Sequence, residues 1–348
     1  MKSIEQCIQT IKAYSGPSIR LMEVCGTHTH SIFEHGIHDL LSPQISLISG
    51  PGCPVCVTPA NYIDRAAEMA LREGWTLCTF GDMMRVPGEQ GSLLEAKARG
   101  GDVRIQYSPM DVLGWAEAEP NRTFVIAAVG FETTLPVYAL LMEHLLDHGL
   151  KNVRLLTSLK AILPALHWIC ESDPAIDGFL GPGHVSAILG SAAYEPLCKK
   201  HHIPLAVAGF SFEQIVLAIH DLLMQVQADT CEAHNLYTNV ISQEGNLRAL
   251  QLVDKYFVHQ TSNWRGLGEI EASGYVLKPE FECFDAGSQF VVNETPERNG
   301  CLCGQVIIGR ISPADCPNFG TICTPASPQG PCMVSMEGTC GIWYANQA

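Results

Sequence analysis

The sequence predicts an α/β fold with two similar open parallel sheets of the Rossmann-like kind around a cleft, followed by a third, irregular domain. Short apolar runs alternate with amphipathic stretches over the first two thirds of the 348 residues. Similar polar, glycine-containing loops follow the apolar runs in both halves of that region, and Gly, Pro and Cys become frequent after about residue 228. Alternating strands and helices are typical of βαβ units, which build parallel sheets.

The apolar runs fall into two sets of expected strands. The first set comprises Ile19–Val24, Ile45–Ser49, Thr76–Phe80 and Val103–Tyr107, and the second comprises Phe124–Val129, Val153–Thr157, Gly178–Leu180 and Leu205–Ala208. Helices are expected between them, for example at Ala60–Glu73, Ser92–Arg99, Leu135–His148 and Phe212–Gln227. Gly149 directly follows the third of these helices and is a plausible stop signal.

These sets define the expected domains. Residues 18–120 form the first α/β domain and residues 121–228 the second, while residues 229–348 with an N-terminal helix at 1–17 form the third. Ligands of open α/β sheets bind beyond the carboxyl ends of the strands. The glycine-containing loops of both domains lie there, so they should line one cleft if the domains face each other.

The charge balance excludes some classes of partner. The chain has 21 basic and 36 acidic residues, a net charge of −15, which disfavours binding to nucleic acid or to an anionic membrane surface. No run reaches the roughly 18 apolar residues of a membrane span, and the N-terminus lacks the apolar centre of a signal peptide. We therefore expect a cytoplasmic protein, in which the 15 cysteines are reduced, and either buried or chemically active.

A C-x-x-C motif follows the second expected strand, in the segment Gly50-Pro51-Gly52-Cys53-Pro54-Val55-Cys56. Its place at the start of a helix would lower the thiol pKa, because the helix dipole favours the thiolate. No second C-x-x-C completes a zinc knuckle, so Cys53 and Cys56 are candidates for a thiol–disulfide pair.

Cys25 ends the first expected strand and is followed by His28 and His30. Cys25 could be a nucleophile with a histidine base, a metal ligand, or simply the last residue of a buried strand. His28 could bind a metal or orient or protonate a group held on Cys25, and His30 is expected to point elsewhere.

The matching polar residues of the second half are Glu132, in a Gly-Phe-Glu-Thr-Thr loop, and His184, in a Gly-Pro-Gly-His loop. Each could act on protons or support a ligand, and Glu132 could equally be a helix cap. Asp82 and Arg85 could likewise act on protons, support a ligand or have only a structural role.

Six cysteines lie in the last fifty residues, at Cys301, Cys303, Cys316, Cys323, Cys332 and Cys340. Prolines break regular structure there, so the segment buries little apolar surface and a metal site is a natural way to order it. Thiolates select zinc or iron–sulfur clusters. The long, uneven spacings differ from paired zinc knuckles and favour a [4Fe–4S] cluster, with zinc as the alternative. Spacing alone does not select four ligands out of six.

Taken together, the motifs resemble the HypD family of hydrogenase maturation factors over nearly the whole chain. The resemblance rests on M-E-V-C-G-T-H-T-H at 22–30, G-P-G-C-P-V-C-V at 50–57, T-F-G-D-M-M-R-V-P-G at 79–88, G-F-E-T-T at 130–134, G-P-G-H-V-S at 181–186 and W-R-G-L-G at 264–268, with the spaced cysteines of the C-terminal segment.

The resemblance implies a scaffold that assembles the Fe(CN)₂CO unit of [NiFe]-hydrogenases with the proteins HypC and HypE, HypE delivering cyanide. It implies that Cys25 holds the iron jointly with HypC and that Cys53 and Cys56 are a redox pair. It also implies a [4Fe–4S] cluster on Cys303, Cys316, Cys323 and Cys340, with Cys301 and Cys332 outside the family's pattern. We expect a monomer apart from these partners.

Two other functions are compatible with the motifs. A stand-alone thiol–disulfide oxidoreductase with a structural zinc site would be colourless and would turn over generic disulfides unaided. In a pure binding module all the cysteines would be structural.

Overall fold

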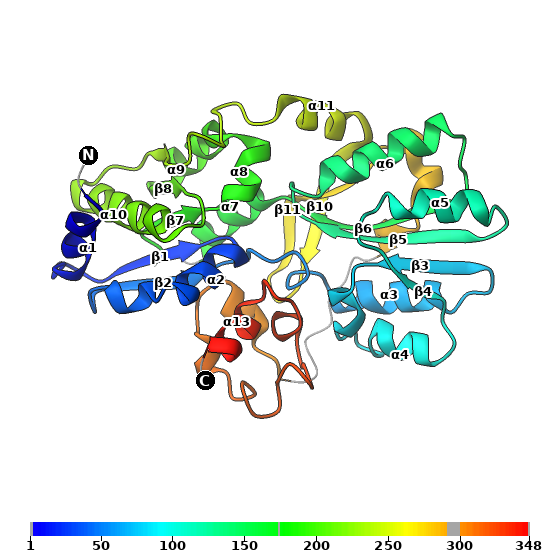
Figure 1. Ribbon diagram of the computed structural model, residues 1–348, viewed down its shortest axis with the longest axis horizontal. Helices are drawn as coiled ribbons and strands as arrows, with labels where there is room; N and C mark the ends of the chain where they lie inside the picture. The colour runs from blue at the N-terminus through cyan, green and yellow to red at the C-terminus, as the bar shows by residue number, and fades with distance from the viewer. Residues whose placement is uncertain (1–2, 173–174, 291–299, 347–348) are drawn as a thin grey trace.

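The computed structural model describes residues 3–172, 175–290 and 300–346. It confirms the α/β class, with two sheets in which most neighbouring strands are parallel. In Figure 1 the two sheets occupy opposite ends of the molecule, and the C-terminal segment lies between and below them.

Sheet A, at the left of Figure 1, is parallel throughout and has the order β2-β1-β7-β8-β9. Its strands are β1 (Ile19–Glu23), β2 (Ile45–Ser49), β7 (Gly178–Gly181), β8 (Leu205–Val207) and β9 (Ala233–Asn235).

Sheet B, at the right, has the order β10-β11-β6-β5-β3-β4. Its four parallel strands are β3 (Trp75–Thr79), β4 (Val103–Ile105), β5 (Thr123–Gly130) and β6 (Val153–Lys160). The hairpin of β10 (Phe257–Trp264) and β11 (Gly268–Leu277) adds to β6 in the antiparallel sense.

All eight expected strands are present, but their grouping into the sheets differs from the expected division at residue 120. The chain forms β1 and β2 of sheet A, then β3 to β6 of sheet B, and returns to sheet A for β7 to β9. Apolar runs show where strands lie in the sequence. The connection that follows each strand decides which sheet the next strand joins. Each sheet therefore combines strands from both of the segments 18–120 and 121–228.

The segments expected to accompany the third domain are also distributed over both sheets. Strand β9 completes sheet A, and the β10–β11 hairpin completes sheet B. Helix α1 (Ile4–Lys12) packs on α10 (Phe212–Ala228), where Cys7 and Ile11 join the core beneath sheet A. Only the part after the hairpin is irregular, with the short helices α12 (Cys303–Ile307) and α13 (Thr339–Asn346).

The helices cover both faces of each sheet. The four expected helices are α3 (Ala60–Ala70), α4 (Leu93–Ala98), α6 (Leu135–Asp147) and α10, and Gly149 follows α6 with a positive φ of 64°. The others are α2 (Gly26–Glu34), α5 (Asp111–Ala118), α7 (Ile162–Ser172), α8 (Gly183–Leu189), α9 (Glu195–His201) and α11 (Leu247–Tyr256).

Strand β5 illustrates the burial of a central parallel strand. Phe124, Ile126 and Ala128 belong to the core shared with α5 and α6. The alternate residues Val125, Ala127 and Val129 belong to the core on the other face, which includes α3 residues. A strand buried on both faces is continuously apolar, which is why the sequence identified it. The second of these cores continues into sheet A and the C-terminal segment.

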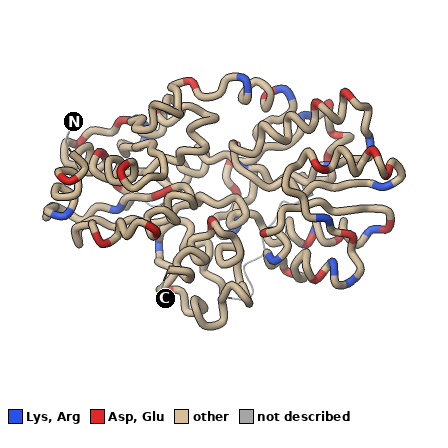
Figure 2. The backbone as a smooth tube through the Cα atoms, viewed as in Figure 1, with Lys and Arg blue, Asp and Glu red and all other residues tan. Residues whose placement is uncertain are grey.

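Charged residues lie mainly on the two outer parts of the molecule in Figure 2. Between residues 300 and 346 the charged residues are Arg310, Asp315 and Glu337. Among the described residues, no helix combines the length and the apolar character that crossing a membrane would require.

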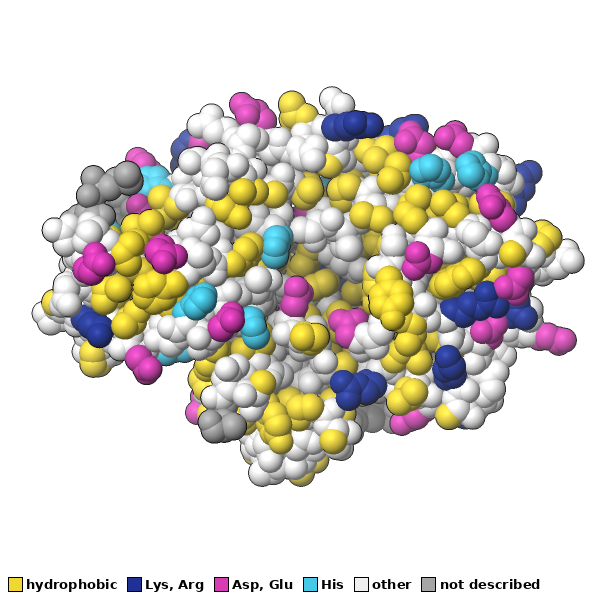
Figure 3. Space-filling view, viewed as in Figure 1, with side chains coloured by type: hydrophobic (Ala, Val, Ile, Leu, Met, Phe, Trp, Pro, Cys, Tyr) yellow, Lys and Arg dark blue, Asp and Glu magenta, His cyan; other side chains and the backbone are white. Residues whose placement is uncertain are grey.

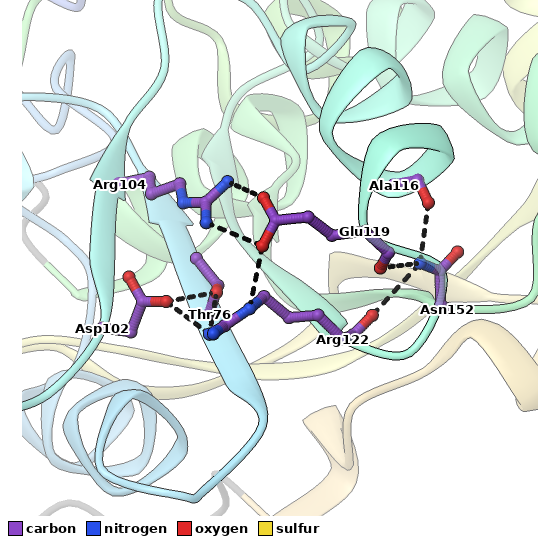
Figure 4. Close-up of polar contacts among 7 residues, drawn as sticks. All are labelled: Thr76, Asp102, Arg104, Ala116, Glu119, Arg122 and Asn152. Atoms are coloured by element: carbon purple, nitrogen blue, oxygen red, sulfur yellow. Dashed lines mark hydrogen bonds and ion pairs between the residues drawn. The ribbon is translucent and has the colours of Figure 1, made fainter.

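A polar network fastens the outer end of sheet B (Figure 4). Glu119 accepts hydrogen bonds from Arg104 at 2.7 and 3.2 Å and pairs with Arg122 Nε at 3.1 Å. Arg122 also contacts Asp102 at 2.6 Å. The side-chain amide of Asn152 donates to the carbonyl oxygens of Ala116, Glu119 and Arg122 at 3.1, 3.3 and 3.1 Å. Asn152 thereby ties the start of β6 to the turn between α5 and β5.

We predict that Asn152→Ala lowers the free energy of unfolding by about 1–3 kcal/mol, because three carbonyl groups lose their shared donor. Lys151→Ala is the matched control; this exposed neighbour should change stability by no more than about 0.5 kcal/mol. Urea unfolding followed by circular dichroism measures both variants. Equal midpoints for the two variants would contradict the importance of this network.

Candidate functional site

One cavity of about 450 Å³ lies where the carboxyl ends of strands from both sheets meet. Sheet A contributes residues after β1, β2 and β7, sheet B contributes residues after β3 and β5, and the C-terminal segment closes one side. The lining includes Cys25, Gly52, Asp82, Gly130, Phe131, His184 and Glu337. Figure 3 shows a hollow at the centre of the molecule, above the C-terminal segment. The cavity joins the loops that the sequence assigned to one cleft.

Cys25 lies in the wall of this cavity as the N-cap residue of α2. Two glycines allow other segments to approach its backbone closely. A Cβ atom at Gly52 would lie 2.6 Å from the Cα of Cys25, and one at Gly26 would collide with the backbone of Glu337. The C-x-x-C loop is therefore packed directly against Cys25, and the C-terminal segment against its neighbour Gly26.

Burial raises the pKa of the Cys25 thiol above its ordinary value of 9.0. Backbone N–H groups of Thr27 and His28 favour the thiolate, but this effect is smaller than desolvation. The thiol is therefore protonated near neutral pH, and a metal ion that binds to it must displace the proton.

His28 and His184 both contact the ring of Phe210. The centroid of the Phe210 ring is 4.7 Å from that of His28 and 4.3 Å from that of His184. His28 is fully buried, which lowers its pKa to about 4. Its Nε2 lies 3.0 Å from the carbonyl oxygen of Gly209, so Nε2 donates and Nδ1 keeps its lone pair. His184 is exposed and lines the cavity, whereas His30 points away and pairs with Glu34.

Glu132 lies beneath the loop that lines the cavity. Its Oε1 accepts a hydrogen bond of 2.9 Å from the backbone N–H of Ile162, so it caps α7. Its Oε2 has no hydrogen-bond partner within the described chain, and burial raises the pKa of Glu132 to about 7. Glu132 is therefore a helix cap, as the sequence suggested, and its own carboxyl group titrates near neutral pH.

Asp82 and Glu337 add acidic groups to the cavity wall. Burial raises the pKa of Asp82, while desolvation and then the Asp82 charge raise that of Glu337. Arg85 does not line the cavity and instead donates to the carbonyl oxygen of Pro325 at 3.0 Å.

The C-x-x-C loop differs from its expected place at a helix start. Residues 54–57 form turns, and α3 begins only at Ala60 with Pro59 as its N-cap. Cys53 and Cys56 are both buried, and the N–H of Cys56 donates to the Cys53 sulfur at 3.2 Å. Burial, rather than a helix dipole, dominates and raises the pKa of Cys56 well above 9.0. The expected lowering of this pKa is therefore wrong.

The cysteines of the C-terminal segment gather next to this loop. The fully buried thiol of Cys332 interacts with the thiols of Cys56, Cys303 and Cys340. The sulfur atoms of Cys301 and Cys303 are 3.0 Å apart. The sequence analysis did not anticipate that the C-x-x-C motif and these cysteines form one continuous group of thiols.

Three of the four cluster ligands implied by the resemblance belong to this neighbourhood. Cys303 and Cys340 contact Cys332, and burial together with the nearby Cys301 and Cys303 raises the pKa of the Cys323 thiol. Cys316 is partly exposed, at the start of the loop that leads to Cys323. Which thiols bind a cluster stays a prediction.

The donor set fits an iron–sulfur cluster. The thiols are soft ligands from separate loops, and Gly330 leaves space beside them, because a Cβ atom there would collide with the sulfur atoms of Cys303 and Cys301. In residues 3–172, 175–290 and 300–346 no group of three or more His, Cys, Asp and Glu side chains has the arrangement of a site for a single metal ion. The thiols contact one another instead.

The sequence analysis missed the residues that support the C-x-x-C loop. The N–H of Arg265 donates to the carbonyl oxygen of Val57 at 2.9 Å, and its guanidinium donates to that of Pro87 at 2.9 Å. The ring of buried Trp264 lies 5.9 Å from that of Phe131. The W-R-G-L-G motif pointed to Trp264 and Arg265, but the residues that they contact are distant in the sequence.

The fold and site define an α/β protein with a group of buried thiols where two mainly parallel sheets meet. Residues 2–347 match the HypD family, described as the hydrogenase formation hypA family. The chain is 43% identical over 330 residues to the hydrogenase maturation factor HypD of Escherichia coli, covering 94% of this chain and 88% of that protein. It is 38% identical over 328 residues to a putative hydrogenase expression/formation protein of Methanocaldococcus jannaschii, covering 94% and 91%.

The chain belongs to the HypD family.

We predict that alkylation of Cys25 by iodoacetamide accelerates roughly tenfold per pH unit up to pH 9 and beyond, because the thiolate reacts and the raised pKa keeps the thiol protonated at lower pH. Peptide mass spectrometry measures the rate, with exposed Cys283 as the internal control. A rate that levels off near pH 8 would show that the cavity stabilises the thiolate instead.

Proposed function

We propose that this protein is a scaffold and redox protein in hydrogenase maturation, where it supports assembly of the Fe(CN)₂CO unit of [NiFe]-hydrogenases. Cys25 holds the iron jointly with the protein HypC, and HypE delivers cyanide. Electrons reach this site from a [4Fe–4S] cluster through Cys53 and Cys56. The chain acts as a monomer apart from these partners, in the cytoplasm.

The observation that carries the proposal is the position of Cys25. It lies in a cavity bordered by both sheets, with the C-x-x-C loop packed against its own backbone and the C-terminal segment packed against Gly26 beside it. A soft thiolate suits a low-spin Fe(II) that also binds cyanide and CO. The cavity, of about 450 Å³, is large enough for a small metal unit.

Ionisable residues in the cavity wall, and the buried His28 close to Cys25, have roles that follow from their protonation. His28 stays neutral at physiological pH, with the Nδ1 lone pair free to bind a metal or accept a hydrogen bond. His184, which also contacts Phe210, is exposed and can exchange protons with incoming groups. Asp82 and Glu337 favour a cationic iron in this wall.

Cys303, Cys316, Cys323 and Cys340 would hold the [4Fe–4S] cluster, which supplies single electrons when bound. Cyanide transfer from a thiocyanate-like carrier consumes electrons, and a vicinal dithiol can pass them as a pair. The buried contact between Cys56 and the thiols of the C-terminal segment supports this route.

Burial disfavours the alternative of a stand-alone thiol–disulfide oxidoreductase with a structural zinc site. Cys53 is 4% exposed and Cys56 is 1% exposed. A thiol that attacks a generic disulfide substrate must reach it at the surface, so these two cysteines are poorly placed to turn over such substrates.

We predict that Cys25→Ala abolishes loading of the iron–cyanide unit and keeps the broad visible absorption of the cluster. Infrared spectra of protein isolated anaerobically with HypC and HypE report the bound CO and CN groups. Cys283→Ala, which changes an exposed cysteine, should load normally. Infrared bands of bound CO and CN that persist in the Cys25→Ala protein would contradict the proposed role of Cys25.

A further inference from the structure

Helix α6 carries two histidines, His144 and His148, at its C-terminal end. The other end of this helix begins at Thr134, which lines the cavity, so the pair lies away from the site described above. The backbone N–H of His148 donates to the carbonyl oxygen of His144 at 3.0 Å, so the helical geometry continues as far as His148. Residues four apart lie on one face of a helix. The centroids of the two imidazole rings are accordingly 5.9 Å apart.

Glu117 of α5 orients one of these rings. Its Oε1 lies 3.0 Å from Nδ1 of His148. The carboxylate accepts a hydrogen bond from Nδ1, which leaves the lone pair of His148 on Nε2. Histidines that bind metal ions are commonly held in this way, with a carboxylate on the ring nitrogen that faces away from the metal. The carboxylate fixes the tautomer that a metal ion requires.

The pair is open to solvent and lies among negative charges. The side chains of His148 and Glu117 are 49% and 53% exposed, and Figure 3 shows histidine side chains side by side on the surface at the upper right, over α6. His148 is the C-cap of α6, where the helix dipole favours a cation. The carboxylates of Glu117 and exposed Asp147 add negative charge, whereas that of Glu143 is paired with Lys255 at 3.0 Å.

We propose that His144 and His148 chelate a divalent transition-metal ion of the class of Zn²⁺, Ni²⁺ and Cu²⁺. Imidazole suits these borderline ions, and two histidines four residues apart on one helical face are a known zinc-binding pair. Glu117 is a positioning residue, because it acts on the metal only through the His148 ring. The proposal is independent of the proposed function, since it uses none of the residues of the central site.

The number of protein ligands determines the character of this site. Within the parts of the chain that the structure describes, no group of three or more His, Cys, Asp and Glu side chains has the arrangement of a metal site. The two histidines therefore supply two ligands, and water supplies the others. Structural zinc sites use four protein ligands, so the ion on α6 exchanges with the solution and the fold does not depend on it.

Equilibrium dialysis of full-length anaerobic protein against Zn²⁺ tests the proposal. The double variant His144→Ala/His148→Ala is the reference, because the thiols of the central site are the same in both proteins and cancel in the difference. We expect the wild type to bind one equivalent of zinc more than the double variant. His259→Ala, which removes an exposed histidine of the β10–β11 hairpin, is the matched control and should keep that equivalent. Equal zinc binding by the wild type and the double variant would overturn the proposal.

The role of Glu117 is tested separately. Glu117→Gln should weaken zinc binding at this site about tenfold, because the carboxylate behind the ring is lost. Glu34→Gln removes the carboxylate beside exposed His30 and should leave the affinity unchanged. An unaltered affinity in Glu117→Gln would contradict the positioning role.

Crystals soaked in ZnCl₂ locate the ion directly. We expect an anomalous-scattering peak between the rings of His144 and His148, and its absence in the double variant. Zinc peaks confined to the cysteines would overturn the inference and leave the proposed function untouched.

Discussion

The contact between the C-x-x-C loop and the cysteines of the C-terminal segment is the interaction on which the functional centre depends. The C-terminal segment has short helices and many prolines, so it cannot form a core of its own. Its cysteines instead act as small apolar side chains and join the large core that spans both sheets. The thiols that anchor the segment include those that we propose as ligands of the cluster.

The interleaved order of the strands brings this centre to the boundary between the sheets. Because the chain leaves sheet A after β2 and returns at β7, the loops after β1, β2 and β7 face those after β3 and β5. Two sheets built from consecutive segments could separate along one linker. Here several connections cross between the sheets, which favours a cavity of fixed shape around Cys25.

Much of the fold could be predicted because buried parallel strands are continuously apolar. The eight expected strands and the four helices named from the sequence are all present in the structure. Which strands pair in each sheet could not be predicted, because an apolar run contains no information about the strand that lies beside it. The β10–β11 hairpin also escaped prediction: β10 is exposed over residues 258–261, so it lacks the apolar run of the other strands.

For the site, motifs identified Cys25, His28, His184 and the C-x-x-C loop, and the structure brings them to one centre. The pKa of Cys56 was predicted wrongly, because burial cannot be read from the motif. The contact between Cys56 and Cys332 could not be predicted either, since it joins residues from opposite ends of the chain. Cys332 has no spacing that distinguishes it from its neighbours.

The central claim is that electrons pass from the C-terminal thiols to the pair beside Cys25. Stepwise anaerobic reduction of oxidised, cluster-bearing protein, with visible absorption and differential alkylation recorded at each step, tests it most directly. The account predicts that Cys53 and Cys56 become alkylatable as electrons are added through the cluster, and that Cys25 stays unchanged. Full reduction of the cluster while Cys53 and Cys56 remain linked as a disulfide would contradict it.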